Sequence, residues 1–124
     1  MKAVIDTHAL YWALVEDTKE LSPKALEIIN DSESLILPSI VLLELLGLLQ
    51  KKGKLIYFDK FIRNIPKSKY IILPLDLATI KETRLLKKQL ELHDKVIVAA
   101  AKMLDLPLIT RDEKIMGIYK KVIW

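Results

Sequence analysis

Short apolar runs typical of strands alternate with helical segments along the whole chain, and this alternation most restricts its possible folds. Strands separated by helices favour a parallel sheet with both faces covered, because each parallel connection needs a long crossover. The predicted strands cover residues 2–5, 34–37, 70–73, 107–110 and 121–124. The predicted helices cover residues 8–15, 23–30, 39–52, 57–65, 76–89, 94–104 and 113–119. The sequence therefore predicts an α/β fold, in which ligands bind beyond the carboxyl ends of the strands.

Length and composition restrict the class of protein. A chain of 124 residues without an internal linker is expected to form one domain, residues 1–124. Hydrophobic residues make up 52% and charged residues 29%, which is typical of a folded protein, and a net charge of +4 permits nucleic-acid binding. Because the chain has no Cys, disulfides and thiolate metal sites are excluded. No apolar run reaches the roughly 18 residues of a membrane span, so we expect a cytoplasmic protein without membrane contact.

Glu44 lies in the middle of a strongly apolar helical run, residues 39–49. Its neighbours on the same helix face are Ile40, Val41, Gly47 and Leu48, none of which is polar or cationic. Burying an unpaired carboxylate is costly, and burial raises its pKa unless a base, hydrogen-bond donors or a metal ion compensate. The alternative is an exposed strip on an otherwise buried helix.

Three more acids stand at the edges of apolar stretches. Asp6 and Asp112 each follow a predicted strand, and Asp94 opens a predicted helix. Each has a structural alternative, because Asp often caps a helix N-terminus. Thr110 and Glu113 fit a capping box, which would leave Asp112 as an acid in the first helical turn.

Taken together, the four acids predict one cleft. At about 5 Å and an effective dielectric near 20, each like-charged pair costs roughly 3 kcal/mol, so four carboxylates need a shared cation. Ligands that are all oxygen favour Mg²⁺ or Mn²⁺, and such ions hold phosphates and activate water. His8 and His93 adjoin two of the acids, but two His without Cys are a poor zinc signal, so we expect auxiliary or structural roles.

Several segments together resemble one family. The opening Val4–Trp12, then Pro38–Leu45, Asp94–Ala101 and Leu108–Asp112 are similar, in this order, to the motifs of PIN-domain ribonucleases. Val122–Trp124 resembles a common ending of the same proteins. The likeness is to the VapC-type toxins of type II VapBC toxin–antitoxin pairs, and it covers the whole chain.

This resemblance implies a single PIN domain with a parallel sheet of about five strands and helices on both faces. It implies that Asp6, Glu44, Asp94 and Asp112 hold Mg²⁺ or Mn²⁺ and catalyse endonucleolytic cleavage of RNA by a metal-activated water. Neighbouring hydroxyls would orient ligands or water as auxiliary groups, here Thr7, Ser39 and Thr110. Homodimerisation and inhibition by a cognate VapB-type antitoxin are further implications.

The chain departs from related toxins before Asp94, where the segment 90–93 is short and Lys95 takes a position often held by Arg. Basic residues that could contact RNA phosphates follow the Glu44 helix or lie near Asp94, although each has solvated surface as its alternative: Lys51, Lys52, Lys54 and Lys95, with Lys87 and Lys88 as second candidates. Alternative functions are a catalytically silent PIN-like module that binds RNA or protein, and a housekeeping RNA-processing nuclease. A flavodoxin-like phosphoacceptor would need a second acid cluster and a strand-end Lys, which we do not find.

Overall fold

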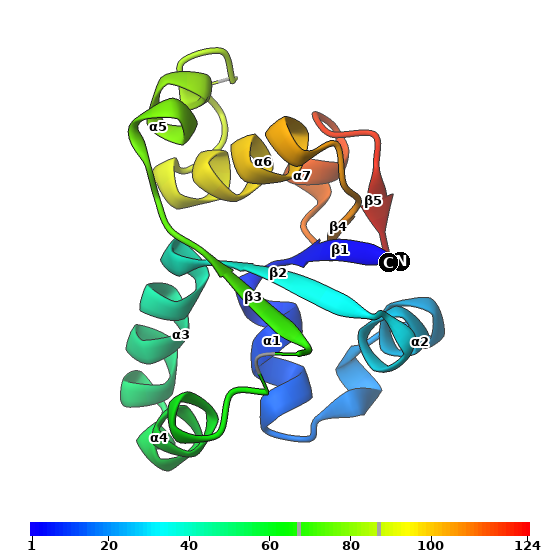
Figure 1. Cartoon of the computed structure of the whole chain (residues 1–124), viewed down its shortest axis with the longest axis vertical. Helices are drawn as coiled ribbons and strands as arrows, with labels where there is room; N and C mark the ends of the chain where they lie inside the picture. Colours follow the sequence, from blue (N-terminus) through cyan, green and yellow to red (C-terminus); the bar gives the residue numbers. More distant parts are fainter. Residues whose placement is uncertain (67, 87) are drawn as a thin grey trace.

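Five parallel strands form one sheet in the order β3-β2-β1-β4-β5 (Figure 1). The computed structural model describes residues 1–66, 68–86 and 88–124. The strands are β1 (Lys2–Ile5), β2 (Ser34–Pro38), β3 (Tyr70–Leu73), β4 (Leu108–Ile109) and β5 (Val122–Ile123). The predicted parallel sheet and its five strands are therefore confirmed, although β4 and β5 are shorter than the pattern indicated.

Helices cover both faces of this sheet. In Figure 1, α1, α2, α3 and α4 lie on one side, and α5, α6 and α7 lie on the other. The described helices are α1 (Thr7–Leu14), the short 3₁₀ helix η1 (Thr18–Glu20), α2 (Pro23–Asp31), α3 (Ser39–Lys51), α4 (Leu55–Arg63), α5 (Leu77–Thr83), α6 (Leu92–Leu104) and α7 (Glu113–Met116). Among the residues described, no helix combines the length and the apolar character that crossing a bilayer would require.

The central strands are buried because helices cover them on two sides. Ala3, Val4 and Ile5 of β1 have no exposed surface, and every residue of β2 is buried. A strand buried on both faces reads as a continuous apolar run, as these two do. Val41, Leu45 and Leu49 of α3 are also fully buried against this core, which fixes the helix that carries Glu44.

The strand order creates a switch point between β1 and β4. The chain leaves β1 toward β2 on one side, whereas β4 pairs with β1 on the other. Ile5 lies beside Ile109 in register, and the Asp6 amide donates to the Ile109 carbonyl oxygen at 3.1 Å. Crevices at such switch points are where open α/β sheets bind ligands. The residues that follow β1 and β4 therefore meet although the chain separates them widely.

The helix after β3 is shorter than predicted. It was expected to reach residue 89, but α5 ends at Thr83. The Arg84 amide donates to the Lys81 carbonyl and the Leu85 amide to the Glu82 carbonyl, so the chain tightens into i→i−3 turns that stop the helix. Lys87, expected on one side of this helix, lies outside the described residues.

Candidate metal centre

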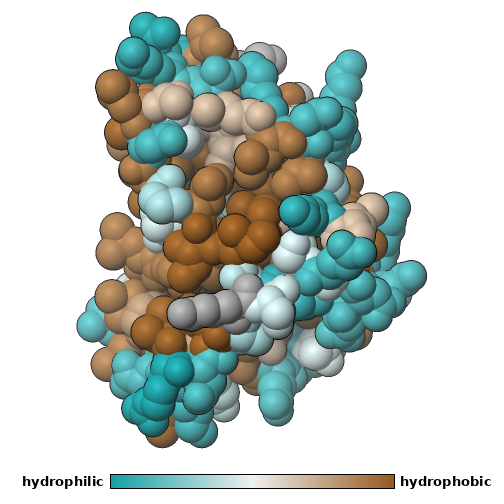
Figure 2. All heavy atoms as spheres, in the orientation of Figure 1, coloured by the Kyte–Doolittle hydropathy of each residue, from teal (hydrophilic) through white to brown (hydrophobic). Residues whose placement is uncertain are grey.

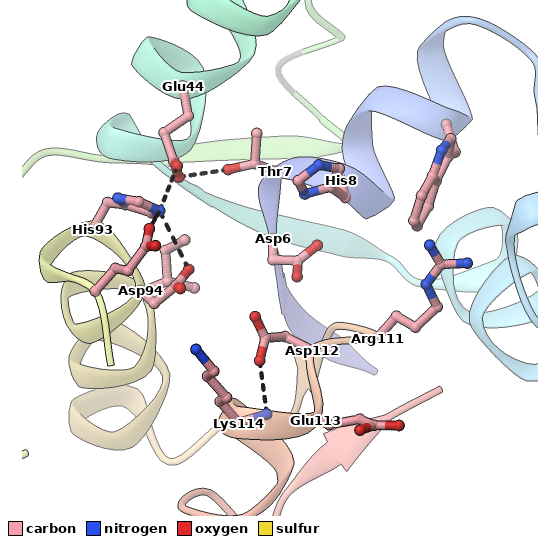
Figure 3. A pocket seen from close by; sticks show the side chains of 13 residues that line it. Asp6, Thr7, His8, Glu44, His93, Asp94, Arg111, Asp112, Glu113 and Lys114 are labelled. Carbon is pink, nitrogen blue, oxygen red and sulfur yellow. Dashed lines mark hydrogen bonds and ion pairs between the residues drawn. The ribbon is translucent and has the colours of Figure 1, made fainter. Parts of the chain in front are cut away.

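A cavity of about 530 Å³ opens at the carboxyl ends of β1 and β4 (Figure 3). Acids from several separate segments line it, and they are Asp6, Glu44, Glu91, Asp94, Asp112 and Glu113. The four acids predicted to share a site thus line one cavity. Glu91 and Glu113 join them.

Asp6 ends β1 and begins α1. One carboxylate oxygen accepts a hydrogen bond from the Ala9 amide at 3.0 Å, so Asp6 is the N-cap of this helix. The other accepts from the hydroxyl of Thr110, which is fully buried. Burial raises the pKa of Asp6 to about 6, even though both hydrogen bonds lower it; the charges of Asp112 and Glu44 raise it further. Capping and site membership, which the sequence left as alternatives, occur together in one side chain.

Glu44 turns from α3 toward the cavity. Its carboxylate accepts from the Thr7 hydroxyl at 2.7 Å and lies 3.0 Å from Nε2 of His93. About a quarter of its side chain is exposed. Glu44 therefore does not lie on a solvent-exposed strip of α3, which was the alternative. The base that its own helix lacks comes from α6, across the site.

His93 stands among three carboxylates. Its Nε2 lies 3.2 Å from Glu91 and 3.7 Å from Asp94, in addition to Glu44 (Figure 3). Burial raises the pKa of Asp94 to about 6, and the charges of Asp112 and Glu44 raise it further, whereas His93 lowers it. Asp94 lies in the first turn of α6 and does not cap it, because the helix begins two residues earlier at Leu92.

Asp112 caps α7, which corrects the predicted capping box. Its carboxylate accepts from the amides of Lys114 at 2.8 Å and Ile115 at 3.1 Å. The Thr110 hydroxyl instead accepts from the Asp112 amide at 3.1 Å while donating to Asp6. Thr110 therefore links the two acids that follow β1 and β4.

The donor set of the cavity fits a hard divalent cation. Six acidic residues line it, together with two residues of fixed positive charge, Arg111 and Lys114, and two imidazoles, His8 and His93. The raised pKa values of Asp6 and Asp94 show that this crowding and burial disfavour the charged carboxylates. Ligand atoms of Glu91, His93 and Asp94 also lie within 4.8 Å of one another. Oxygen donors favour Mg²⁺ or Mn²⁺, and Mn²⁺ also accepts an imidazole nitrogen.

Other predicted residues lie away from the cavity. The Ser39 hydroxyl accepts from the Leu75 amide at 3.1 Å, and Ser39 lines a separate small hollow. Nζ of Lys52 and of Lys54 lie 5.7 and 5.8 Å from the ring centre of Tyr11. Neither these two lysines nor Lys51 and Lys95 line the cavity.

Sequence reasoning missed several residues that line the cavity: Trp12, Glu91, Arg111, Glu113 and Lys114. Arg111, Glu113 and Lys114 adjoin Asp112 directly, so their closeness to a strand end was an available signal. Trp12 follows His8 by one helical turn, which places both on one side of α1. For Glu91 the signal was weaker, because the predicted helix starts at residue 94, two residues after the observed start of α6 at Leu92.

Comparisons with known proteins identify the family of this chain. The model of the PIN domain family matches residues 3–121. A search of curated proteins found no match. Among solved structures, VapBC2 of Rickettsia felis, bound to a promoter DNA fragment, is similar with a TM-score of 0.75 and 17% identity over 100% of this chain and 98% of that chain.

Two further structures are similar over nearly their whole length. A toxin–antitoxin complex from Klebsiella pneumoniae has a TM-score of 0.66 and 20% identity, covering 98% of this chain and 96% of that one. VapC20 of Mycobacterium tuberculosis, described as a toxin that cleaves the sarcin–ricin loop, has a TM-score of 0.66 and 12% identity, covering 95% and 97%. At these identities the structures support the fold, and the family match decides membership. The chain belongs to the PIN domain family.

Proposed function

We propose that this protein is a metal-dependent endoribonuclease and the toxin of a VapBC-type toxin–antitoxin pair. One observation carries the proposal: Asp6, Glu44, Asp94 and Asp112, from four distant segments, line one cavity at the switch point of the sheet. Membership of the PIN family and the similarity to toxins of VapBC systems, one of them described as cleaving RNA, support it.

The four acids are proposed to hold Mg²⁺ or Mn²⁺. When bound, this ion would supply charge neutralisation for a phosphodiester and activate water for its hydrolysis. Thr7 holds Glu44, and Thr110 holds Asp6, so both hydroxyls fix the direction of a carboxylate. Lys114 lines the same cavity and would provide positive charge for the RNA backbone.

Partners follow from the same proposal. The cognate antitoxin would be a VapB-type protein, because the similar solved structures include toxin–antitoxin complexes. A second copy of this chain is the partner proposed for a hydrophobic surface formed by exposed side chains of α3, β3 and α5 (Figure 2). The protein would act on RNA in the cytoplasm.

Cleavage assays with the Asp6→Asn variant test the catalytic proposal. Asn keeps the helix cap but removes the charge, so cleavage of RNA with Mg²⁺ or Mn²⁺ should fall by more than the roughly 100-fold that loss of an outer-shell partner costs. Asp76→Asn is the matched control, because Asp76 caps α5 in the same way and does not line the cavity.

Two results would contradict the proposal. One is RNA cleavage that persists in EDTA or in the Asp6→Asn variant. The other is a wild-type protein whose thermal stability does not rise with Mn²⁺. That result is the one expected of a catalytically silent module.

A further inference from the structure

One side of the cavity carries planar side chains that the proposed metal site does not use. We call His8, Trp12 and Arg111 the planar wall. The ring centres of His8 and Trp12 lie 5.7 Å apart at 45°, one helical turn apart on α1. The Arg111 guanidinium carbon lies 4.4 Å from the Trp12 ring centre. All three line the same cavity as the acids, and Figure 3 shows His8 and Arg111 across the acids from His93.

Arg111 is held in place although it is exposed. Trp12 lies against its guanidinium, and Nη1 lies 3.3 Å from a carboxylate oxygen of Glu20. About half of the Arg111 side chain remains accessible to solvent. An exposed Arg normally samples many rotamers, so two contacts that fix one plane prepare a rigid surface.

Trp12 is supported from behind. Its ring centre lies 6.0 Å from that of Trp124, at 54°, and Trp12 is half-buried against the core. Trp124 does not line the cavity. The wall therefore presents aromatic rings and one guanidinium group beside the carboxylates, whose bound metal ion is proposed to hold the scissile phosphate.

This chemistry matches an unpaired nucleobase. Proteins read single-stranded RNA by stacking its bases on aromatic rings or on Arg guanidinium planes. Bases inside a duplex already stack on one another and are not available to such a wall. A peptide could also contact Trp12, but planar groups beside a cluster of carboxylates suit a nucleotide, whose phosphate and base would occupy the two halves of one cavity.

We propose that the planar wall binds one unpaired nucleobase of the RNA substrate, next to the phosphate that the metal ion at the acids would hold. This inference rests on the proposed ribonuclease function. It deepens that function by naming the side chains of this chain that would bind a base beside the cleaved phosphate.

Binding measurements on full-length protein carrying Asp6→Asn, which leaves the RNA uncut, test the proposal. The probes are a fluorescein-labelled, unstructured RNA of about 12 nucleotides and an oligomer of equal length and charge that lacks bases. Trp12→Leu should weaken RNA binding about tenfold, within the range of one base–aromatic stack, and leave binding of the abasic oligomer unchanged. Trp12→Phe should cause a smaller loss.

Trp124→Leu is the matched control, because it removes the ring behind Trp12 without removing a cavity side chain. It should retain most of the RNA affinity. If Trp12→Leu fails to fold by circular dichroism, His8→Ala and Trp12→Phe decide, and each should reduce binding of RNA but not of the abasic oligomer.

Three outcomes would overturn the inference: equal affinity of the parent protein for RNA and the abasic oligomer, equal losses for both probes, or unchanged RNA binding in Trp12→Leu. The last would leave the wall to a protein partner. Cleavage by the wild type is measured separately. Cleavage without base-dependent binding refutes the wall alone, whereas base-dependent binding without metal-dependent cleavage refutes the ribonuclease proposal.

Discussion

Asp6 shows at the scale of one residue how a site can oppose stability. The residue is only 8% exposed, and its pKa is raised from 3.8 to about 6. The folded protein therefore holds the Asp6 proton more tightly than the unfolded chain does. Two hydrogen bonds orient the carboxylate, but they do not offset the loss of hydration.

The sign of this shift predicts a pH dependence. Between about pH 4 and pH 6 the folded state binds more protons than the unfolded state, so the free energy of unfolding should fall as pH rises. For Asp6 alone, the free energy of unfolding should be lower at pH 7 than at pH 4 by about 3 kcal/mol at most. Urea denaturation in EDTA at pH 4 and pH 7 measures it for the wild type and for Asp6→Asn.

In the Asp6→Asn variant the loss between these pH values should be smaller, and its stability at pH 7 should exceed that of the wild type. Asn can still accept the Ala9 hydrogen bond that caps α1. Identical pH dependence in the two proteins would show that ionisation of Asp6 does not destabilise the folded state. Mn²⁺ should stabilise the wild type at pH 7 and have little effect on the variant.

At the scale of an element, α7 depends on a residue of the candidate metal centre. The helix spans only Glu113–Met116, and Asp112 satisfies two of its free amides. So short a helix has little stability of its own, because nucleation is costly. Asp112 therefore carries a structural role and a proposed ligand role together.

Two substitutions at Asp112 separate these roles. Asp112→Asn should keep the cap and lose metal-dependent cleavage. Asp112→Ala should lose both the cap and cleavage. Its free energy of unfolding should be lower than that of Asp112→Asn by about 1 kcal/mol. Thermal denaturation in EDTA together with cleavage assays measures the difference. Equal stability of the two variants would refute the structural role of the cap.

Local signals explain which elements the sequence could predict. Ser22 and Pro23 begin α2, and the Ser22 hydroxyl accepts from the Ala25 amide at 3.0 Å, as expected. Gly53 lies two residues after the end of α3 and has a positive φ of 67°, which Gly adopts without strain. The early end of α5 was missed because its tightened turns leave no Gly or Pro signal.

The site was predictable in its acids but not in its contacts. Strand ends indicate where Asp6 and Asp112 lie, because parallel strands point the same way. The contact of His93 with Glu44 joins α6 to α3. It could not be predicted, because only the tertiary packing of these two helices brings the side chains together. The role of the four acids as metal ligands stays a prediction.

At the scale of the whole molecule, exposed apolar side chains gather on one surface of the part of the chain that the structure describes. Figure 2 shows apolar side chains gathered over β3 and beside it. The exposed members on α3, β3, α5 and the turn before α5 are Leu43, Ile71, Ile72, Leu75, Leu77 and Ile80. Soluble monomers rarely expose large contiguous surfaces of this kind, and β3 also ends the sheet with an open edge.

If this surface joins two copies, Leu43→Lys or Ile72→Lys should convert a dimer into a monomer. Light scattering coupled to size exclusion measures the mass of each variant. Met116→Lys is the control, because Met116 is also exposed but lies on α7. A wild type that is monomeric at micromolar concentration would contradict the dimer.

The position of β1 in the sheet also sets when the cavity can assemble during synthesis. β1 is made before β4, yet the two strands pair, and the Asp6 amide donates a hydrogen bond to the Ile109 carbonyl. Contacts between such distant segments form late, since a long loop must close first. The Thr110 hydroxyl and the Asp112 carboxylate reach Asp6 only after they leave the ribosome. The cavity therefore cannot assemble on a nascent chain before Asp112 has left the ribosome.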